Sequence, residues 1–395
     1  MSTTQHGHTA GAGEAQANPF FFNPFAFHPA AFAPVFDPAS VVSAWMQEAQ
    51  AGMRRAMATP KVVEAAAKVT KGCTPYDVVM TEGPVRLLRY KGKADKKHAT
   101  PVLFVFALVN RPYVLDILPH KSVIRQYLNH GFDVFMIDWG IPEPQDKSKT
   151  LADYVEGNMH AMVRRVLQET GQPSLNLVGY CMGGTMSAMY TSRHQDLVRT
   201  LTLMAAPLSW GPACKSLLMT WTDSSAFNVD ALVDQVGMIP PQFLGSSFAM
   251  MKPVANFFQK WVGFAEKMED EKFLEEFFAM ETWSNDNIPI SGEVYRDFVK
   301  FGFQQDRLVK GTFPLGGRPV NLGNITCPVL TITADKDHLV LPEQSFPVEE
   351  AVSSTDITRM AVAGGHIGLA VGSRAHKELW PHACAWAAQR SDAAR

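Results

Sequence analysis

A glycine-flanked cysteine at the end of an apolar run constrains this 395-residue chain more than any other feature. The run reads Leu177-Val178-Gly179-Tyr180-Cys181-Met182-Gly183-Gly184 and continues into a helix-forming segment. A strand that turns this sharply into a helix leaves no room for a Cβ two positions before or after its tip, so Gly179 and Gly183 are required there. The residue at the tip has a strained backbone. We therefore identify Cys181 as a nucleophile on a strand–helix elbow.

The segments around this elbow alternate between strand and helix from about residue 75 onward. Apolar segments predict strands at Asp77–Met80, Val85–Tyr90, Val102–Leu108, Asp133–Asp138, Leu175–Gly179, Thr200–Ala205, Val329–Ala334 and Thr358–Val362. Helical stretches follow several of them, at Ser122–Asn129, Leu151–Thr170 and Gly184–Ser192. Short apolar strands separated by helices indicate a mostly parallel sheet with helices on both faces. Together with the elbow, this pattern predicts an α/β-hydrolase fold.

The alternation stops between Pro207 and Ile325, where phenylalanine, methionine and tryptophan are frequent. Because this stretch lies between two sheet strands, we interpret it as a helical cap over the active site. The chain then divides into a Phe/Pro-rich, flexible N-terminal segment (1–36), an N-terminal helical segment (37–74), the α/β core (75–206 with 326–392) and the cap (207–325). Lysines at 91, 93, 96 and 97 predict a solvated hairpin turn between two early strands.

The N-terminal segment is unusual because seven phenylalanines between residues 20 and 36 alternate with prolines at 19, 24, 29 and 34. Prolines at this spacing exclude both a regular helix and a central strand. Two interpretations stay open. The segment packs onto the body of its own chain, or it presents an apolar surface to a partner subunit or a hydrophobic product.

An acid and a histidine follow the elbow in the order that this fold uses. The strand 329–334 runs into a loop with two candidate acids, Asp335 and Asp337. The next strand leads to the glycine-flanked His366, which is the expected base. In this arrangement His366 accepts the proton of Cys181, and the carboxylate orients the imidazole.

Backbone N–H groups are expected to form the oxyanion hole of this site. One is that of Met182, directly after the nucleophile, and the other comes from the loop after strand 102–108, where Val109 is the candidate. His338 adjoins the acid, and either a structural hydrogen bond or a role in catalysis accounts for it.

Composition limits the compartment and the ligands. The formal net charge is −2, so bulk electrostatics favours neither nucleic acid nor an anionic membrane surface. Five scattered cysteines without CxxC spacing argue against a disulfide framework or a metal site and suit a reducing cytosol. No signal peptide and no apolar run long enough to span a membrane are readable. We expect a cytoplasmic protein without a metal or cofactor.

The choice of cysteine over serine favours acyl transfer from a thioester. Exchange of a thioester substrate for a thioester with Cys181 is nearly thermoneutral, so the acyl group keeps its activation. An alcohol then takes the acyl group downhill to an oxygen ester, provided that the cap excludes water. Acyl-CoA is therefore the expected donor, with coenzyme A as the leaving group.

Several motifs resemble those of polyhydroxyalkanoate synthases. They are Phe106-Ala107-Leu108-Val109-Asn110-Arg111-Pro112-Tyr113-Val114-Leu115-Asp116, Ile137-Asp138-Trp139-Gly140, Gly179-Tyr180-Cys181-Met182-Gly183-Gly184, Ile325-Thr326-Cys327-Pro328-Val329-Leu330, Asp337-His338-Leu339-Val340 and Gly364-Gly365-His366-Ile367-Gly368. The similarity covers roughly residues 60–390. The first motif, which contains the string Val-Asn-Arg-Pro-Tyr, and the short chain most resemble the class III catalytic subunit. Class IV is close behind.

This resemblance implies a triad of Cys181, Asp337 and His366 acting on (R)-3-hydroxyacyl-CoA, with 3-hydroxybutyryl-CoA the expected substrate. It also implies supporting hydrogen bonds near the acid from Asp116 and His338. Members of the family work as dimers or larger assemblies at the surface of polymer granules, and classes III and IV need a second subunit.

Two features depart from the family pattern. Tyr180 stands where an aliphatic residue is more frequent, which leaves the size of the substrate open, and the Phe/Pro-rich segment is longer than usual. Two rival hypotheses remain at this stage: a cysteine hydrolase of the same fold that cleaves esters or thioesters, and a granule-bound scaffold without activity.

Overall fold

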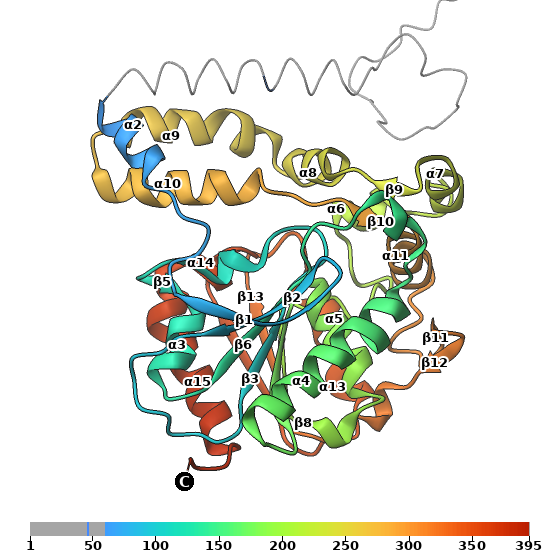
Figure 1. The fold of residues 1–395 in the computed structure, drawn as a ribbon. Helices are drawn as coiled ribbons and strands as arrows, with labels where there is room; N and C mark the ends of the chain where they lie inside the picture. Colours follow the sequence, from blue (N-terminus) through green and yellow to red (C-terminus); the bar gives the residue numbers. More distant parts are fainter. Residues whose placement is uncertain (1–45, 47–59, 395) are drawn as a thin grey trace, which may run out of the picture.

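An eight-stranded sheet forms the centre of the computed structural model, which describes residue 46 and residues 60–394 (Figure 1). The strand order is β1-β2-β6-β3-β7-β8-β13-β14. The strands are β1 (Tyr76–Glu82), β2 (Val85–Tyr90), β6 (Val134–Asp138), β3 (Val102–Val105), β7 (Leu175–Tyr180), β8 (Val198–Met204), β13 (Val329–Ala334) and β14 (Ile357–Val362). The pairs β1–β2 and β2–β6 are antiparallel, and every pair from β6 to β14 is parallel. The predicted α/β-hydrolase fold is confirmed.

Helices cover both faces of this sheet. Figure 1 shows α3 (Val123–Asn129) and α15 (Trp380–Gln389) on one face, and α4 (His160–Thr170) and α5 (Met182–Thr191) on the other. Every residue of β3, β6, β7 and β13 is buried, as expected of strands with helices above and below. The predicted helix over 151–170 is present in two parts, since a π-helical stretch, Asp153–Met159, runs directly into α4.

The lysine-rich stretch after β2 does not form the predicted hairpin turn. Strands β2 and β3 are not neighbours, because β6 lies between them in the sheet. The stretch is therefore a crossing connection rather than a turn between paired strands. Two of its lysines form ion pairs with neighbouring segments, Lys91 with Asp77 and Lys96 with Asp133.

The chain between β8 and β13 is mainly helical and lies over one end of the sheet (Figure 1). Its elements are α6 (Leu217–Trp221), α7 (Val229–Val236), β9 (Met238–Ile239), α8 (Pro241–Met250), the π-helical stretch Ala255–Gln259, α9 (Lys260–Lys267), α10 (Glu271–Ser284), β10 (Ile290–Ser291), α11 (Gly292–Asp297), the π-helical stretch Phe298–Gln304, β11 (Phe313–Leu315) and β12 (Arg318–Val320). This region is called the cap below.

A small hydrophobic core joins the cap to α2 (Pro60–Ala67). Val62 of α2 packs with Phe264 of α9 and with Leu274 and Phe278 of α10, and all four are buried. Figure 1 shows the three helices side by side above the sheet. The cap is thus stabilised partly by a segment that precedes the sheet in the sequence.

Other sequence-based expectations concern residues outside the described part of the chain. The expectations for the Phe/Pro-rich segment 1–36, and for the helical segment 37–74 before residue 60, lie outside the described residues. Residue 46 is the exception. Within the described residues, no helix is long and apolar enough to cross a membrane.

We expect the cap core to depend on Leu274, which is fully buried. Leu274→Ala should lower the free energy of unfolding by about 2–5 kcal/mol, because it removes buried methyl groups and leaves a cavity. Val262→Ala on α9 is the matched control, since that side chain is 44% exposed. Chemical denaturation of both variants measures the difference, and equal losses would contradict the assignment of a cap core.

Candidate active site

The elbow holds Cys181 between the end of β7 and the start of α5 with φ 56° and ψ −129°. A Cβ on Gly179 would lie 2.5 Å from the Cα of Gly184, and one on Gly183 would overlap the backbone of Val105 and Phe106 in and after β3. Such distances are far below van der Waals contact, so side chains are excluded at both positions. The two glycines let α5 approach the sheet closely enough to hold Cys181 in its strained conformation.

Asp337 and His366 form a buried pair at the ends of two adjacent parallel strands. Asp337 follows β13 and His366 follows β14, and the Nδ1 of His366 lies 2.7 Å from the Oδ2 of Asp337. The other carboxylate oxygen of Asp337 accepts the N–H groups of Leu339 and Val340, both at 2.9 Å. The carboxylate is therefore fixed by its own loop and directs one oxygen at the imidazole.

The alternative acid, Asp335, lies at the surface and does not contact His366. It is exposed, and its Oδ1 accepts the N–H of Gly364 at 2.8 Å. The N–H of Lys336 also donates to the carbonyl of Gly364 at 2.8 Å. These bonds tie the acid loop to the histidine loop without contacting the imidazole, so Asp337 is the residue that orients His366.

The surroundings of His366 favour its protonated form. Burial lowers the pKa of the imidazole, but the charges of Cys181 and Asp337 and the hydrogen bond with Asp337 outweigh that effect and raise the pKa well above its usual value. A positively charged imidazole beside Cys181 is the partner that a thiolate needs. Cys181 and Asp337 thus both favour the charged form of the imidazole that lies between them.

The cap holds the loop that carries Val109, the candidate oxyanion-hole residue. The carbonyl of Val109 accepts the N–H of Ile288 at 3.5 Å, and the indole N–H of Trp283 donates to the carbonyl of Arg111 at 2.8 Å. Further bonds join Asn110 to Asn287 at 3.2 Å and Tyr113 to Asp286 at 3.1 Å. We call these four bonds between the cap and the loop 109–113 the oxyanion-loop clamp.

Met182, whose N–H is the other predicted oxyanion-hole donor, is the first residue of α5.

The two predicted supporting residues have different environments. Asp116 is buried and accepts hydrogen bonds from Cys73, Thr74 and Ser122, so its carboxylate fastens the segment before β1 and does not bond to the triad. The Nδ1 of His338 is buried without a hydrogen-bond partner among the described residues. Burial and the charge of Lys252 lower the pKa of His338, which favours the neutral ring.

Sequence reasoning missed the contact between Tyr180 and His366. The ring of Tyr180 stacks on the imidazole, with ring centroids 5.0 Å apart and an angle of 24° between the planes. The only signal in the sequence was the position of Tyr180 directly before the nucleophile. Its side chain lies against the catalytic base, whereas its bulk had suggested an effect on substrate size.

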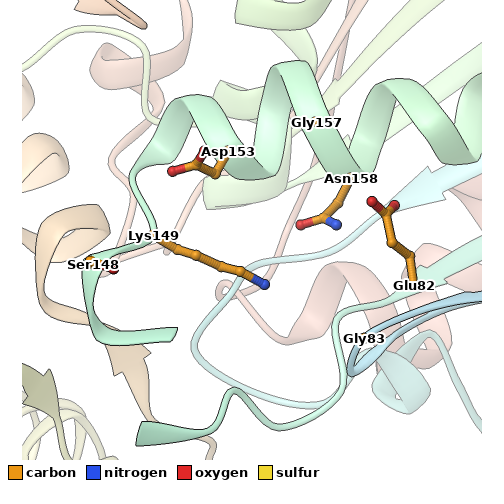
Figure 2. Close-up of a pocket in the computed structure, with 7 residues that line it drawn as sticks. All are labelled: Glu82, Gly83, Ser148, Lys149, Asp153, Gly157 and Asn158. Carbon is orange, nitrogen blue, oxygen red and sulfur yellow. The ribbon is translucent and has the colours of Figure 1, made fainter. Parts of the chain in front are cut away.

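A surface pocket of about 450 Å³ lies apart from these residues, between the β1–β2 turn and the π-helical stretch before α4 (Figure 2). Its lining residues are Glu82, Gly83, Ser148, Lys149, Asp153, Gly157 and Asn158. None of them belongs to the triad. Among the described residues, no group of three or more His, Cys, Asp or Glu side chains is placed to hold a metal ion.

The fold and the site define an α/β hydrolase with a cysteine in place of the usual serine. A family model described as the alpha/beta hydrolase fold matches residues 101–372, and one described as the poly-beta-hydroxybutyrate polymerase (PhaC) N-terminus matches residues 42–128. A solved structure of a lipase candidate from Sulfolobus solfataricus is similar in fold, with 14% identity and a TM-score of 0.51 over 80% of this chain and 99% of that one.

Relatives with higher sequence identity identify the family within this fold. The poly(3-hydroxyalkanoate) polymerase subunit PhaC of Haloferax mediterranei is 41% identical over 88% of this chain and 70% of the relative. The subunit of the same name from Allochromatium vinosum is 37% identical over 82% of this chain and 90% of the relative. The chain belongs to the poly(3-hydroxyalkanoate) polymerase subunit PhaC family.

Gly183→Ala tests the close packing at the elbow. We expect the variant to lose about 1–3 kcal/mol of unfolding free energy and most of its activity, because the new methyl group displaces α5 from β3. Gly263→Ala on α9 is the matched control, since a Cβ there meets nothing within 4 Å. Thermal denaturation and CoA release should separate the two variants, and a Gly183→Ala enzyme like the wild type in both would refute the packing argument.

Asp337→Asn and Asp335→Asn test the choice of acid. The first should lower turnover by about 10⁴-fold, because an amide N–H facing Nδ1 imposes the wrong imidazole tautomer. The second should be mild, because the asparagine oxygen still accepts the N–H of Gly364. Steady-state CoA release measures both, and the opposite ranking would make Asp335 the orienting acid.

Proposed function

We propose that this protein polymerises (R)-3-hydroxyacyl-CoA into a poly(3-hydroxyalkanoate) through an acyl-cysteine at Cys181. The observation that carries the proposal is the elbow cysteine beside the buried Asp337–His366 pair, in a chain of the polymerase family. A serine at the same place would suit ester hydrolysis, whereas a thiolate exchanges readily with the thioester of an acyl-CoA.

In the first step His366 takes the proton of Cys181, and the Sγ of Cys181 attacks the thioester carbonyl of the substrate. The new C–S bond forms while negative charge collects on the carbonyl oxygen, and in this scheme the N–H groups of Met182 and Val109 donate hydrogen bonds to that oxygen. One such donor is worth about 3 kcal/mol. The tetrahedral intermediate collapses with cleavage of the bond to coenzyme A, and His366 donates its proton to the departing sulfur.

In the second step the hydroxyl group of a hydroxyacyl chain attacks the acyl-cysteine. His366 takes the hydroxyl proton, an oxygen ester forms, and the Cys181 thiolate leaves. The reaction runs downhill because a thioester is replaced by an ester. Water competes with the hydroxyl at this point, so exclusion of water under the cap decides between polymerisation and hydrolysis.

Further parts of the proposal rest on the family resemblance. The scheme uses no cofactor, because coenzyme A enters with the substrate and leaves as product. We place the protein in the cytoplasm at the surface of polymer granules, as a homodimer with a second subunit of the class III or IV type. 3-Hydroxybutyryl-CoA is the substrate to test first.

Incubation of the purified protein with 3-hydroxybutyryl-CoA tests the proposal, with CoA release and turbidity followed together. Cys181→Ala should abolish both signals, because it removes the thiol that carries the acyl chain in this scheme. Cys181→Ser should be nearly inactive, since His366 would have to deprotonate a far weaker acid. Polymer formation by the alanine variant would disprove the proposal.

The same assay separates the rival functions. CoA release with free 3-hydroxybutyrate and no turbidity would identify a hydrolase. Neither CoA release nor labelling of Cys181 by a thiol-reactive probe would identify a scaffold without activity.

A further inference from the structure

Tyr180 makes two separate contacts with the histidine of the triad. Its ring lies nearly parallel to the imidazole of His366, and its hydroxyl group donates a hydrogen bond to the backbone carbonyl of His366 at 3.0 Å. Burial raises the pKa of Tyr180 well above its usual value, so the hydroxyl stays protonated and remains a donor. One side chain therefore holds both the ring and the backbone of the base.

The backbone of the histidine loop is held by bonds that do not contact the imidazole. Gly364 is bonded to Asp335 and Lys336, and the N–H of Leu369 donates to the carbonyl of His366 at 3.2 Å. The torsion about the bond between Cβ and the imidazole is broad for histidine. The bond from Nδ1 to Asp337 fixes one ring atom, and a flat surface against the ring face is what fixes the plane of the imidazole.

Tyr180 is itself held in place. Phe106 contacts its ring edge-on, with centroids 5.5 Å apart, and the carbonyl of Phe106 accepts the indole N–H of Trp139 at 2.8 Å. Tyr180 is also the last residue of β7, next to the nucleophile in the chain. Its position is therefore coupled to the position of Cys181 through a single peptide bond.

We propose that Tyr180 is a positioning residue that sets the plane of the His366 imidazole and thereby aims Nε2 at the Sγ of Cys181. The stacked ring also favours the positively charged imidazole, since a cation is attracted to an aromatic face. This inference deepens the proposed function by adding a residue to the same site, and it rests on that function only for its effect on turnover.

The titratable groups around His366 come from two other segments. Cys181 lies on the elbow, and Asp337 and His338 lie on the loop after β13. A substitution of Tyr180 changes none of these three side chains. A change in the pH dependence of Cys181 reactivity therefore reports the alignment of His366 with its partners.

The experiment compares Tyr180→Phe and Tyr180→Leu with Tyr190→Phe and Tyr190→Leu. Tyr190 is the matched control because it is also buried, stacks on His194 with centroids 4.5 Å apart and bonds through its hydroxyl to His160 at 3.0 Å. Two quantities are measured: the pH profile of Cys181 alkylation by iodoacetamide, corrected with Cys181→Ala, and kcat and KM for 3-hydroxybutyryl-CoA.

Tyr180→Leu should shift the acid limb of the alkylation profile to higher pH, because a misaligned imidazolium stabilises the thiolate less. It should lower kcat by about 100-fold with KM nearly unchanged, the loss expected from a displacement of about 1 Å. Tyr180→Phe keeps the stacked ring, so its acid limb and its kcat should both lie close to those of the wild type. The Tyr190 variants should leave the limb in place.

An unshifted acid limb in Tyr180→Leu, or an equal shift in Tyr190→Leu, would overturn the positioning role. Should Tyr180→Leu fail to fold, Tyr180→Ile takes its place, because it also removes the stacked ring and suits the end of a strand. An unshifted limb in Tyr180→Ile would refute the proposal. Alkylation needs no substrate. A shifted limb in a protein that makes no polymer would therefore support the positioning role while the proposed function fails.

Discussion

The contact between the start of α5 and the backbone of β3 is the constraint on which the catalytic arrangement depends. It exists because Gly183 has no side chain, and it fixes the place where β7 ends and the helix begins. Cys181 then has no relaxed conformation available and stands at positive φ. Packing at this joint places the nucleophile at the helix N-terminus, where backbone N–H groups and the helix dipole favour negative charge.

The acid and the base are positioned by a different principle, the pairing of parallel strands. Strands β13 and β14 lie next to each other in register, so the loops that follow them meet at the same edge of the sheet. Bonds between Asp335, Lys336 and Gly364 join the two loops, and Tyr180 at the end of β7 stacks on the imidazole of His366. The cap adds a third contribution through the oxyanion-loop clamp. The elbow strand and the two loops thus meet at His366.

The sequence was sufficient for the strands of the central sheet, the elbow and the loops that carry Asp337 and His366, because each has a local signature. Apolar runs such as 329–334 specify buried strands, and glycine spacing specifies the elbow. Strand pairing has no such signature, and the hairpin expected after β2 was wrong because β6 occupies the place beside it. The direction of the Tyr180 side chain could not be predicted from the sequence either, because it depends on a contact with His366, which lies 186 residues further along the chain.

The points at which the cap joins the sheet determine how far the cap can vary in length. The cap leaves the sheet after β8 and returns at β13, and these strands are direct neighbours, with Leu201 paired with Val329. Because the two strands are parallel, Val329 faces Leu201 and lies three residues before the level of Met204, where the cap leaves. The two attachment points are therefore separated by roughly 10 Å along the strands and by one strand spacing of about 4.8 Å across them. The closure entropy of such an excursion rises only slowly with its length. The catalytic sheet is consequently insulated from the size of the cap, and the part of the molecule that surrounds the substrate can be lengthened, shortened or replaced while the register of the strands that hold the triad stays the same.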